Sequence, residues 1–485
     1  MPITTSVPSS IDTPNTFHEF HYVKAGGSPV AVPARVLLVG VKTSGGAAST
    51  EVPVRIFDTA DAITKFGKGS ELALMAAKAF EQGNINQAYG YGGMPELWGC
   101  SIAPPTGVAA SSTLTVTVTT ATAGTVVFRI AGRTLFAGVS AGDSVTAIAT
   151  AISTAINAAS RELPVTATSS AGVVTIPHNT TGTNGNDVSY EIVSTPSGVS
   201  VAWARPTDGT GTVSIANSLD AAVDRNYDAV AISIHSSTAI TNSATHLTAM
   251  WGFAQKYFRW VFLGDRASQA TTQAYATAAD SDKIVVVTCE NTPSLPSEIA
   301  AAAAVLAFGA ERPNMNFDNA RIALYPPLAT YAYTASEIES AIDGGMTPLR
   351  PTPDGTALEV VKLVTTKVTD NSVPFLAAAD LAISRTLAYR ATQYDIQYRL
   401  RFRQEVIDGD LNDPNATLLA RIRDMCVEID REMGRLGYLR NVEDYVSQIR
   451  VEEASSPMGR VLVQAPCRVA NPLHQVAFDH LSYYL

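Results

Sequence analysis

The chain carries few charges for its length. Only 16% of its 485 residues are Asp, Glu, Lys or Arg, whereas about 25% is usual in soluble globular proteins. The formal net charge of −10 argues against a dedicated nucleic-acid-binding protein. Because 46% of the residues are hydrophobic, the chain can form a sizeable core. With so little charge, it is also expected to bury part of its surface against other subunits.

Cysteines and long apolar runs are scarce as well. Cys100, Cys289, Cys426 and Cys467 are too far apart to form a C-x-x-C pair, so we expect scattered core residues in a reducing compartment. The longest uncharged apolar run, residues 299–310, is shorter than the roughly 20 residues that span a bilayer. The N-terminus has no signal-peptide pattern. We therefore expect a chain that folds in a cytoplasm, with no membrane and no nucleic acid among its partners.

Alternating strand and helix patterns dominate the middle of the chain. Apolar β-branched runs alternate with helical segments between residues 208 and 350, which is typical of a parallel sheet with helices on its faces. A buried strand is expected at 35–41 and a helix at 59–83. Residues 105–207 differ, because they are rich in Thr, Ser, Ala, Val and Gly and contain no lysine. This composition shift predicts a small inserted module.

The predicted fold class is therefore α/β and multi-domain. It has a central parallel-type sheet, an inserted β-rich α/β module and extended β-arms at both termini. The parts are an N-terminal arm (1–22), a first α/β core segment (23–104), the inserted module (105–207), an α/β domain (208–350), a C-terminal core domain with long helices (351–455) and a C-terminal arm (456–485).

The C-terminal core domain is expected to begin with a hairpin at 357–370 and to continue with two amphipathic helices. The apolar stripe of the first comprises Leu376, Ile383, Leu387, Tyr394, Tyr398 and Phe402. The stripe of the second comprises Leu418, Ile422, Met425, Ile429 and Met433.

Lysine is absent after Lys367, although thirteen arginines follow. Five of them lie along the first long helix: Arg385, Arg390, Arg399, Arg401 and Arg403. Arginine is favoured in ordered ion pairs and interfaces because its planar fork matches a carboxylate. Two interpretations stay open, namely pairing with Asp and Glu of the same chain and an intermolecular role.

The string Gly138-Val139-Ser140-Ala141-Gly142 matches the G-x-S-x-G motif that presents a serine nucleophile between a strand and a helix. His178 follows in the same module, which is too small to be a hydrolase. The alternative is a helix start, and we expect Ser140 to be a turn residue and Asp143 to cap the helix that follows.

Other patterns that suggest chemistry are incomplete. Residues 40–46 begin like a phosphate loop, but Gly46 and Ala47 stand where Lys and Ser or Thr are required. Asp265 and Glu290 end parallel strands, where either catalysis or helix capping is common. The seven histidines lack metal-ligand spacing and are expected at surfaces or interfaces. We therefore predict no enzyme activity, no cofactor and no metal.

The segment at 35–80 resembles the N-terminal part of contractile-tail sheath proteins of bacteriophages. Its most specific match is Phe66-Gly67-Lys68-Gly69-Ser70, which follows a strand ending in LLVG. The NFDNARIALYPP and EIDREMGRLGYLRNVEDY segments are similar to the Mu-like branch of that family, with 104–206 as a variable insertion.

This resemblance implies a structural subunit of the phage tail, assembled in the host cytoplasm. Sheath subunits form stacked hexameric rings around an inner tube, exchange arm strands with their neighbours, and contract when the baseplate is triggered, driving the tube through the host envelope for genome ejection. The implied partners are further copies of the chain, the inner tube protein, and the baseplate and tail-terminator proteins. The inserted module would lie on the outer surface, and the C-terminal core would face the tube.

Both termini of the chain end in strand-like segments. A free apolar strand is an aggregation hazard unless it pairs, and strand addition is a recognised mode of assembly. The residues expected to form inter-subunit arm strands are Phe17, Glu19, Phe20, Tyr22, Gln475, Val476, Ala477, Phe478, Leu481, Tyr483 and Tyr484. The five arginines of the first long helix are the candidates for tube contact. The alternatives are another filament- or surface-forming protein and a serine hydrolase on Ser140.

Overall fold

The computed structural model describes residues 34–233, 236–252, 255–310, 312–328, 333–370, 373–374, 379–402, 418–453, 460–471 and 474. The chain divides into two compact units. Unit 1 comprises residues 1–31 and 389–470, and unit 2 comprises residues 32–388 and 471–485. The division falls inside helix α9 (Leu381–Phe402). The predicted arm residues all lie outside the described ranges.

A mixed sheet forms the centre of unit 2. Its strands, in spatial order, are β14 (Ala320–Ile322), β16 (Leu358–Val360), β15 (Met346–Pro351), β13 (Ile284–Thr288), β12 (Trp260–Asp265), β11 (Ala229–Ile232), β1 (Arg35–Val41), β3 (Glu96–Ile102) and β2 (Val54–Ile56). The strands from β15 to β3 are parallel, while β14, β16 and β2 pair antiparallel at the edges. The predicted parallel-type sheet is confirmed. The predicted core segment and α/β domain, however, share this one sheet.

Helices cover both faces of the sheet, as the alternating side chains of β1 demonstrate. Val36 and Leu38 pack with α2 (Glu71–Tyr89) and α7 (Pro296–Gly309). Leu37 and Val39 pack on the opposite face, against α4 (Ala216–Asp220) and α5 (Ser237–Met250). The α/β part also contains α6 (Gln269–Ala279) and α8 (Ala335–Asp343).

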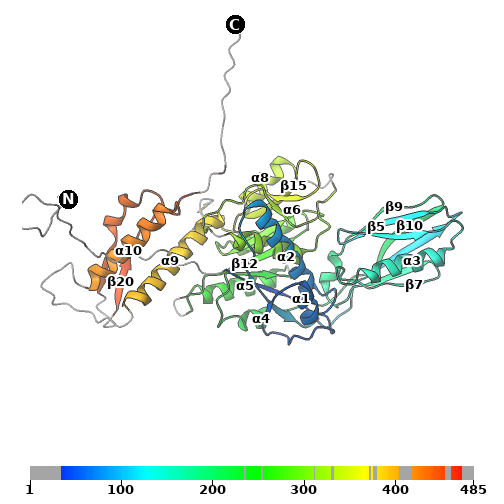
Figure 1. The fold of residues 1–485 in the computed structure, drawn as a ribbon, viewed down its shortest axis with the longest axis horizontal. Helices are drawn as coiled ribbons and strands as arrows, with labels where there is room; N and C mark the ends of the chain where they lie inside the picture. Colours follow the sequence, from blue (N-terminus) through cyan, green and yellow to red (C-terminus); the bar gives the residue numbers. More distant parts are fainter. Residues whose placement is uncertain are drawn as a thin grey trace, which may run out of the picture. The chain divides into compact units, whose positions relative to one another are not determined.

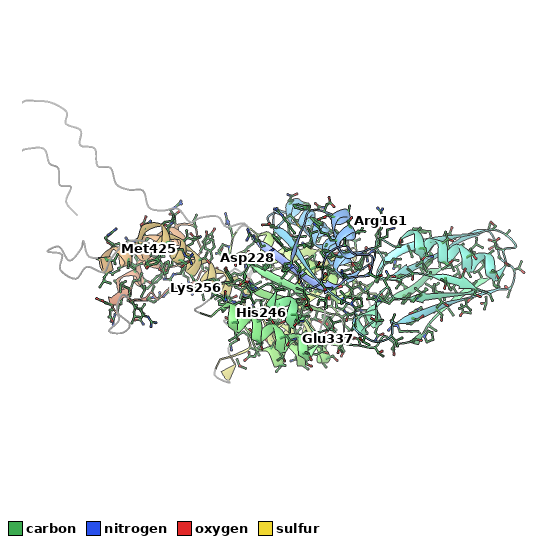
Figure 2. All side chains as sticks on the ribbon, turned by 90° about the horizontal axis from the view of Figure 1, so that it is seen from below. Arg161, Asp228, His246, Lys256, Glu337 and Met425 are labelled. Carbon is green, nitrogen blue, oxygen red and sulfur yellow. The ribbon has the colours of Figure 1, made fainter. Side chains whose placement is uncertain are left out.

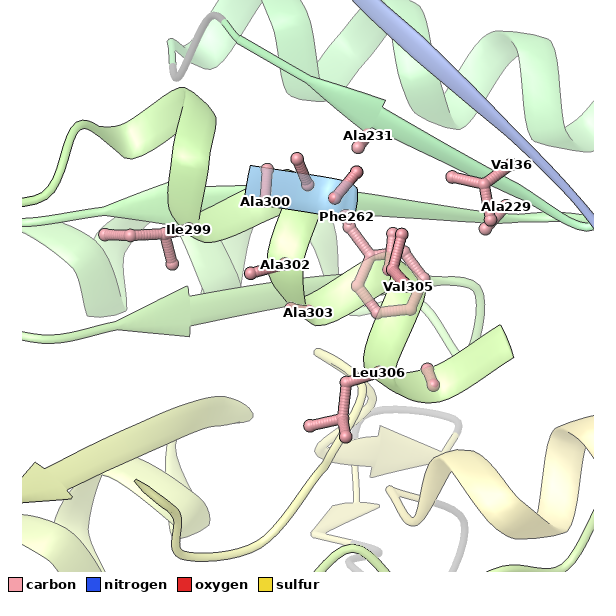
Figure 3. Close-up of a cluster of buried hydrophobic side chains, with 14 of the residues drawn as sticks. Val36, Ala229, Ala231, Phe262, Ile299, Ala300, Ala302, Ala303, Val305 and Leu306 are labelled. Carbon is pink, nitrogen blue, oxygen red and sulfur yellow. The ribbon is translucent and has the colours of Figure 1, made fainter. Parts of the chain in front are cut away.

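Helix α7 is buried along its whole length. Its alanines allow close packing onto the sheet, where Val36, Ala229 and Phe262 lie in the same cluster (Figure 3). A Cβ on Gly264 would lie 2.2 Å from the carbonyl oxygen of Pro296, so β12 and α7 approach more closely there than a larger residue permits.

The predicted helix at 59–83 is broken into α1 (Thr59–Phe66) and α2. Gly67 and Gly69 have φ angles of +89° and +58°, and the Ser70 hydroxyl caps α2 by accepting from the Ala73 N–H. A Cβ on Gly69 would lie 2.2 Å from the carbonyl oxygen of Leu163. The FGKGS string is therefore a helix-breaking joint that contacts the inserted module.

The inserted segment forms two small sheets around its own hydrophobic core. One sheet contains β10 (Val199–Thr207), β4 (Ser111–Val118), β8 (Val173–Pro177) and β7 (Thr168–Ser170), in that order. The other contains β6 (Arg133–Val139), β5 (Gly124–Ile130) and β9 (Tyr190–Ser194). Helix α3 (Val145–Ala158) packs against both sheets (Figure 1), and a 3₁₀ turn, η1, spans Thr183–Asp187.

The hairpin predicted at 357–370 is wrong. Strand β16 pairs with β14 and β15, whereas β17 (Thr369–Asp370) pairs with β18 (Val373–Pro374). Strand β16 lies between β14 and β15 in the large sheet, so both of its partners lie earlier in the chain than the predicted hairpin places them.

Unit 1 contains the C-terminal half of α9, α10 (Leu418–Arg435), the 3₁₀ turns η4 (Val442–Asp444) and η5 (Val446–Gln448), and the strands β19 (Arg450–Glu453) and β20 (Val461–Gln464). The two strands pair antiparallel, and β19 packs against α10. Among the helices of the described ranges, none combines the length and hydrophobicity needed to cross a bilayer.

Candidate functional site

Helix α10 provides the apolar centre of unit 1. All five residues of its predicted stripe, Leu418 to Met433, are buried, and Met425 marks this core in Figure 2. The prediction for α10 is thus confirmed. The predicted stripe of α9 is wrong at Leu387 and Tyr398, whose exposed fractions are 41% and 48%.

The buried side of α9 in unit 1 is polar and contains Arg390. The guanidinium of Arg390 donates to both carboxylate oxygens of Asp430, at 2.8 and 2.7 Å, and Asp430 is completely buried. The Tyr394 hydroxyl donates to the same carboxylate at 2.8 Å, and Arg390 also donates to the Ala465 carbonyl oxygen. The bond from Arg390 to Asp430 raises the pKa of Arg390 against the effect of burial. Arg390 therefore joins α9, α10 and the segment after β20.

Arg385 lies on the same helix within unit 2 and is also buried. It donates to the carbonyl oxygen of Ala307 at 2.7 Å and stacks over the Phe308 ring at 4.5 Å. Burial lowers its pKa to about 10, which the charge of Asp228 opposes. Arg385 and Arg390 thus have intrachain partners, as one of the two interpretations anticipated, and neither is available on the described surface for a tube contact.

The C-terminal end of α9 is exposed. Arg399 pairs with Asp395 at 2.8 Å and keeps 66% of its side chain exposed, while Arg401 pairs with Glu428 at 2.7 Å. Tyr398 and Leu400 flank Arg399, with exposed fractions of 48% and 71%. Arg403 lies outside the described residues. Of the five predicted arginines, Arg399 and Arg401 are the ones that the structure leaves near the surface.

The hairpin β19–β20 has a sheet edge on each side that no described strand covers. Leu462 and Val463 on β20 have exposed fractions of 46% and 44%, and Glu452 and Glu453 on β19 are also exposed. Such edges offer unpaired N–H and C=O groups to a further strand. Among the described residues, both edges of this hairpin are therefore open.

The large sheet of unit 2 has the geometry that ligand-binding α/β proteins use. Strand β3 lies on one side of β1, whereas β11 and then β12 lie on its other side, so the order of the strands reverses at β1. The crevice at the carboxyl ends of two such strands is where ligands usually bind. Here that position, between β1 and β11, lies beside Glu71 at the start of α2.

The inserted module contacts the residues beside this position. Asn184 of η1 donates to the Glu71 carboxylate at 2.9 Å, Asn179 donates to the Gly69 carbonyl oxygen at 3.2 Å, and Arg266 donates to the carbonyl oxygen of Asp187. Burial raises the pKa of Glu71 to about 7, and the bond from Asn184 opposes this rise. The cavity beside Asp265, at the ends of β12 and β13, measures about 10 Å³, enough for about one water molecule.

A second attachment of the module is ionic. Arg133 of β6 pairs with Glu298 of α7 at 2.8 Å, and neither side chain is more than 10% exposed. The other oxygen of Glu298 accepts from the Leu295 N–H at the start of α7. The module is therefore fixed to the carboxyl edge of the sheet, where an enzyme of this architecture would bind its substrate.

A buried arginine lies at the opposite, amino end of the sheet. Arg259 donates to His246 at 2.8 Å and to the Arg225 carbonyl oxygen at 2.6 Å. Burial lowers the pKa of His246 to about 3, and the charge of Arg259 adds to this effect. Burial also raises the pKa of Asp228 to about 6. Figure 2 labels Asp228 and His246 on this side of unit 2. Because chemistry in α/β sheets occurs at the carboxyl ends, we assign this cluster a structural role.

The G-x-S-x-G string closes a turn. The Ser140 N–H donates to the Asp143 carboxylate at 2.6 Å, and Ser140 is exposed. The cap of α3 is Ser144, whose hydroxyl accepts from the Ala147 N–H, so the prediction that Asp143 caps the helix is wrong. His178 belongs to the segment after β8, in the other sheet of the module, and its buried Nδ1 contacts Thr180. No described hydrogen bond joins Ser140 to a histidine.

The remaining candidates have structural partners. Lys42 donates to the Ala48 carbonyl oxygen at 2.5 Å and so holds the loop after β1, and Asp265 accepts from the Ala267 N–H at the start of α6. His178 and His246 are buried, contrary to the surface prediction. Cys100, Cys289 and Cys426 are buried as predicted, whereas Cys467 is half-buried. Within the described ranges, no three His, Cys, Asp or Glu side chains are grouped to hold a metal ion.

Comparison with known proteins finds a similar curated sequence. The Mu-like prophage FluMu tail sheath protein of Haemophilus influenzae is 31% identical over 184 residues, which are 38% of this chain and 36% of that protein. The match thus covers about a third of the length of this curated relative. No protein-family model matches the chain.

Solved structures resemble nearly the whole chain. The sheath tail protein of Desulfitobacterium hafniense has a TM-score of 0.52 at 12% identity, covering 94% of this chain and 97% of that one. The sheath tail protein Lin1278 of Listeria innocua has a TM-score of 0.51 at 15% identity, covering 92% and 94%. The chain therefore has the fold of tail sheath proteins, and the predicted resemblance to them is confirmed.

Proposed function

We propose that this chain is a structural subunit of a contractile phage tail sheath and not an enzyme. The single observation that carries the proposal is the open-edged β19–β20 hairpin, in a chain that has the sheath fold and whose two termini are strand-like in sequence. A protein that both accepts and supplies a strand can link copies of itself into a polymer.

In this proposal, the arms 1–22 and 456–485 of one subunit add strands to the hairpins of neighbouring subunits. The polymer consists of stacked hexameric rings around an inner tube, bound to baseplate and tail-terminator proteins in the virion tail, with assembly in the host cytoplasm. Contraction rearranges the subunits while the strand links persist, and drives the tube through the host envelope for genome ejection.

The exposed end of α9 is the candidate contact with the tube. Arg399, with Tyr398 and Leu400 beside it, combines a charge with apolar area, which suits a partner surface that is acidic and partly apolar. The burial of Arg385 and Arg390 favours Arg399 over them as the contact. The contacts of the inserted module with Glu71 and Glu298 at the carboxyl edge of the sheet further support a structural rather than an enzymatic role.

The test is polymer formation by truncated chains. Deletion of residues 1–22, or of residues 475–485, is expected to leave a folded subunit that does not form tubes under negative stain, whereas the intact chain forms striated hollow tubes. Circular dichroism and sedimentation check that the truncated subunits are folded and monodisperse. Tubes of normal appearance from both truncations would refute the arm mechanism.

A further inference from the structure

His474 lies between two carboxylates of unit 2. Its Nδ1 is 2.6 Å from Asp318 Oδ2, and its Nε2 is 2.8 Å from Asp380 Oδ2. An ionised carboxylate only accepts hydrogen bonds, so both contacts are satisfied together when each ring nitrogen carries a proton. Charge-assisted hydrogen bonds of this kind are shorter and stronger than neutral ones.

Both carboxylates are held by the core. Asp380 precedes α9, and its second oxygen accepts from the Ala382 N–H at 2.8 Å, which caps the helix. Asp318 precedes β14 and accepts from the side-chain amide of Asn316 at 3.1 Å. Their side chains are only 13% and 15% exposed, so water competes weakly for the two bonds. His474 therefore binds to a preorganised pair.

His474 directly precedes the predicted C-terminal arm strand. Residues 389–470 belong to unit 1, the chain returns to unit 2 at 471, and the predicted C-terminal arm strand continues from 475. We propose that His474 is the anchor that fixes the starting point of this arm strand on unit 2. This inference rests on the proposed function, in which residues 475–485 add to a neighbouring subunit.

An anchored origin favours strand addition for an entropic reason. Ordering each residue of a free segment costs roughly 1–2 kcal/mol of backbone entropy. With His474 bound to the two carboxylates, that residue is already held in the free subunit, so the cost of ordering it is not added when the arm strand binds. Without the anchor, the neighbour must order His474 together with the arm.

The experiment compares His474→Ala and Asp318→Asn with the intact chain. Hydrogen exchange by mass spectrometry on the unassembled subunit measures the protection of residues 460–474, and sedimentation measures the critical concentration for polymerisation. We expect exchange in this segment to accelerate, and the critical concentration to rise, by roughly tenfold for each charge-assisted bond removed. Asp343→Asn, which neutralises an exposed carboxylate at the end of α8, is the matched control and should change neither.

The outcomes distinguish a failure of the His474 anchor from a failure of the proposed arm mechanism. If deletion of 475–485 abolishes polymerisation but His474→Ala changes neither exchange nor critical concentration, the anchor is refuted while the arm mechanism survives. If that deletion leaves polymerisation normal, the arm mechanism fails, and with it the role of the anchor. Asp318→Asn protects the test against a folding defect in the histidine variant, because it removes the charge of one partner, and so the charge assistance of that bond, with little change in shape.

Discussion

Protonation of Glu71 should control how strongly unit 2 resists unfolding near neutral pH. Burial beneath the inserted module raises the pKa of Glu71 from 4.5 to about 7. In the unfolded chain the carboxyl group titrates near its ordinary value, so the folded protein binds more protons between pH 4.5 and 7. The free energy of unfolding therefore falls as the pH rises through this window, and the loss is complete above pH 7.

The magnitude follows from the size of the shift. One pKa unit corresponds to about 1.4 kcal/mol, so a rise of roughly 2.5 units corresponds to about 3 kcal/mol. Glu71→Gln keeps the shape and a hydrogen-bond acceptor for Asn184, but it has no charge to bury. We expect this variant to match the intact chain at pH 4.5 and to be more stable by about 3 kcal/mol at pH 8.

Urea-induced unfolding at several pH values, followed by exchange of residues 71–75 and 183–187, measures this difference. Buried Asp228 and His246 also titrate, but the subtraction of variant from intact chain removes their contributions. Glu339→Gln, at an exposed position of α8, is the control and should leave the pH profile unchanged. A stability gain for Glu71→Gln that does not depend on pH, or a loss at pH 8, would refute the reasoning.

Three further substitutions test the packing. Asp430→Ala leaves buried Arg390 unpaired, and we expect a loss of about 3–5 kcal/mol in the unfolding of unit 1, measured by exchange in α9 and α10. Gly69→Ala, at φ +58° and against the Leu163 carbonyl oxygen, should cost at least about 2 kcal/mol in urea unfolding, whereas Gly138→Ala meets open space and should cost almost nothing. Ser144→Ala should destabilise α3 by about 1 kcal/mol, whereas Ser140→Ala should leave the stability unchanged. Labelling of Ser140 by a fluorophosphonate probe would contradict the structural role of that turn.

The parts of the fold that periodicity determines could be predicted from the sequence. The buried strands β11, β12 and β13 are continuous apolar runs, and α10 has one clear apolar stripe, so local pattern and tertiary burial agree. The edge strand β14 and its neighbour β16 are short, and they pair with each other across more than thirty residues of chain. Their register therefore could not be read from a local window.

The arginines of α9 could not be assigned from spacing for a related reason. Whether Arg390 is buried or exposed depends on Asp430, forty residues further along the chain and on another helix. The signal that was available is the preference for arginine over lysine after Lys367, because a planar guanidinium suits a buried bidentate pair. That preference predicted ordered pairs but not which arginines form them. The contact of His474 with Asp318 and Asp380 likewise joins three segments that are distant in the sequence, so no local motif predicts it.

The sheet of unit 2 demonstrates why architecture alone does not establish activity. It has the strand order, the glycine-rich turns and the helix N-terminus that an α/β enzyme uses to bind a ligand. In this chain the same place holds Asn184, and the module that supplies it is also joined to α7 through Arg133 and Glu298. If the module detached, Glu71 would become solvated and its pKa would return toward 4.5. The raised pKa is thus a property of the joint between module and sheet, and it should disappear when η1 is deleted even though Glu71 remains. A carboxyl group that still titrates near pH 7 after that deletion would place the origin of the shift in the sheet itself.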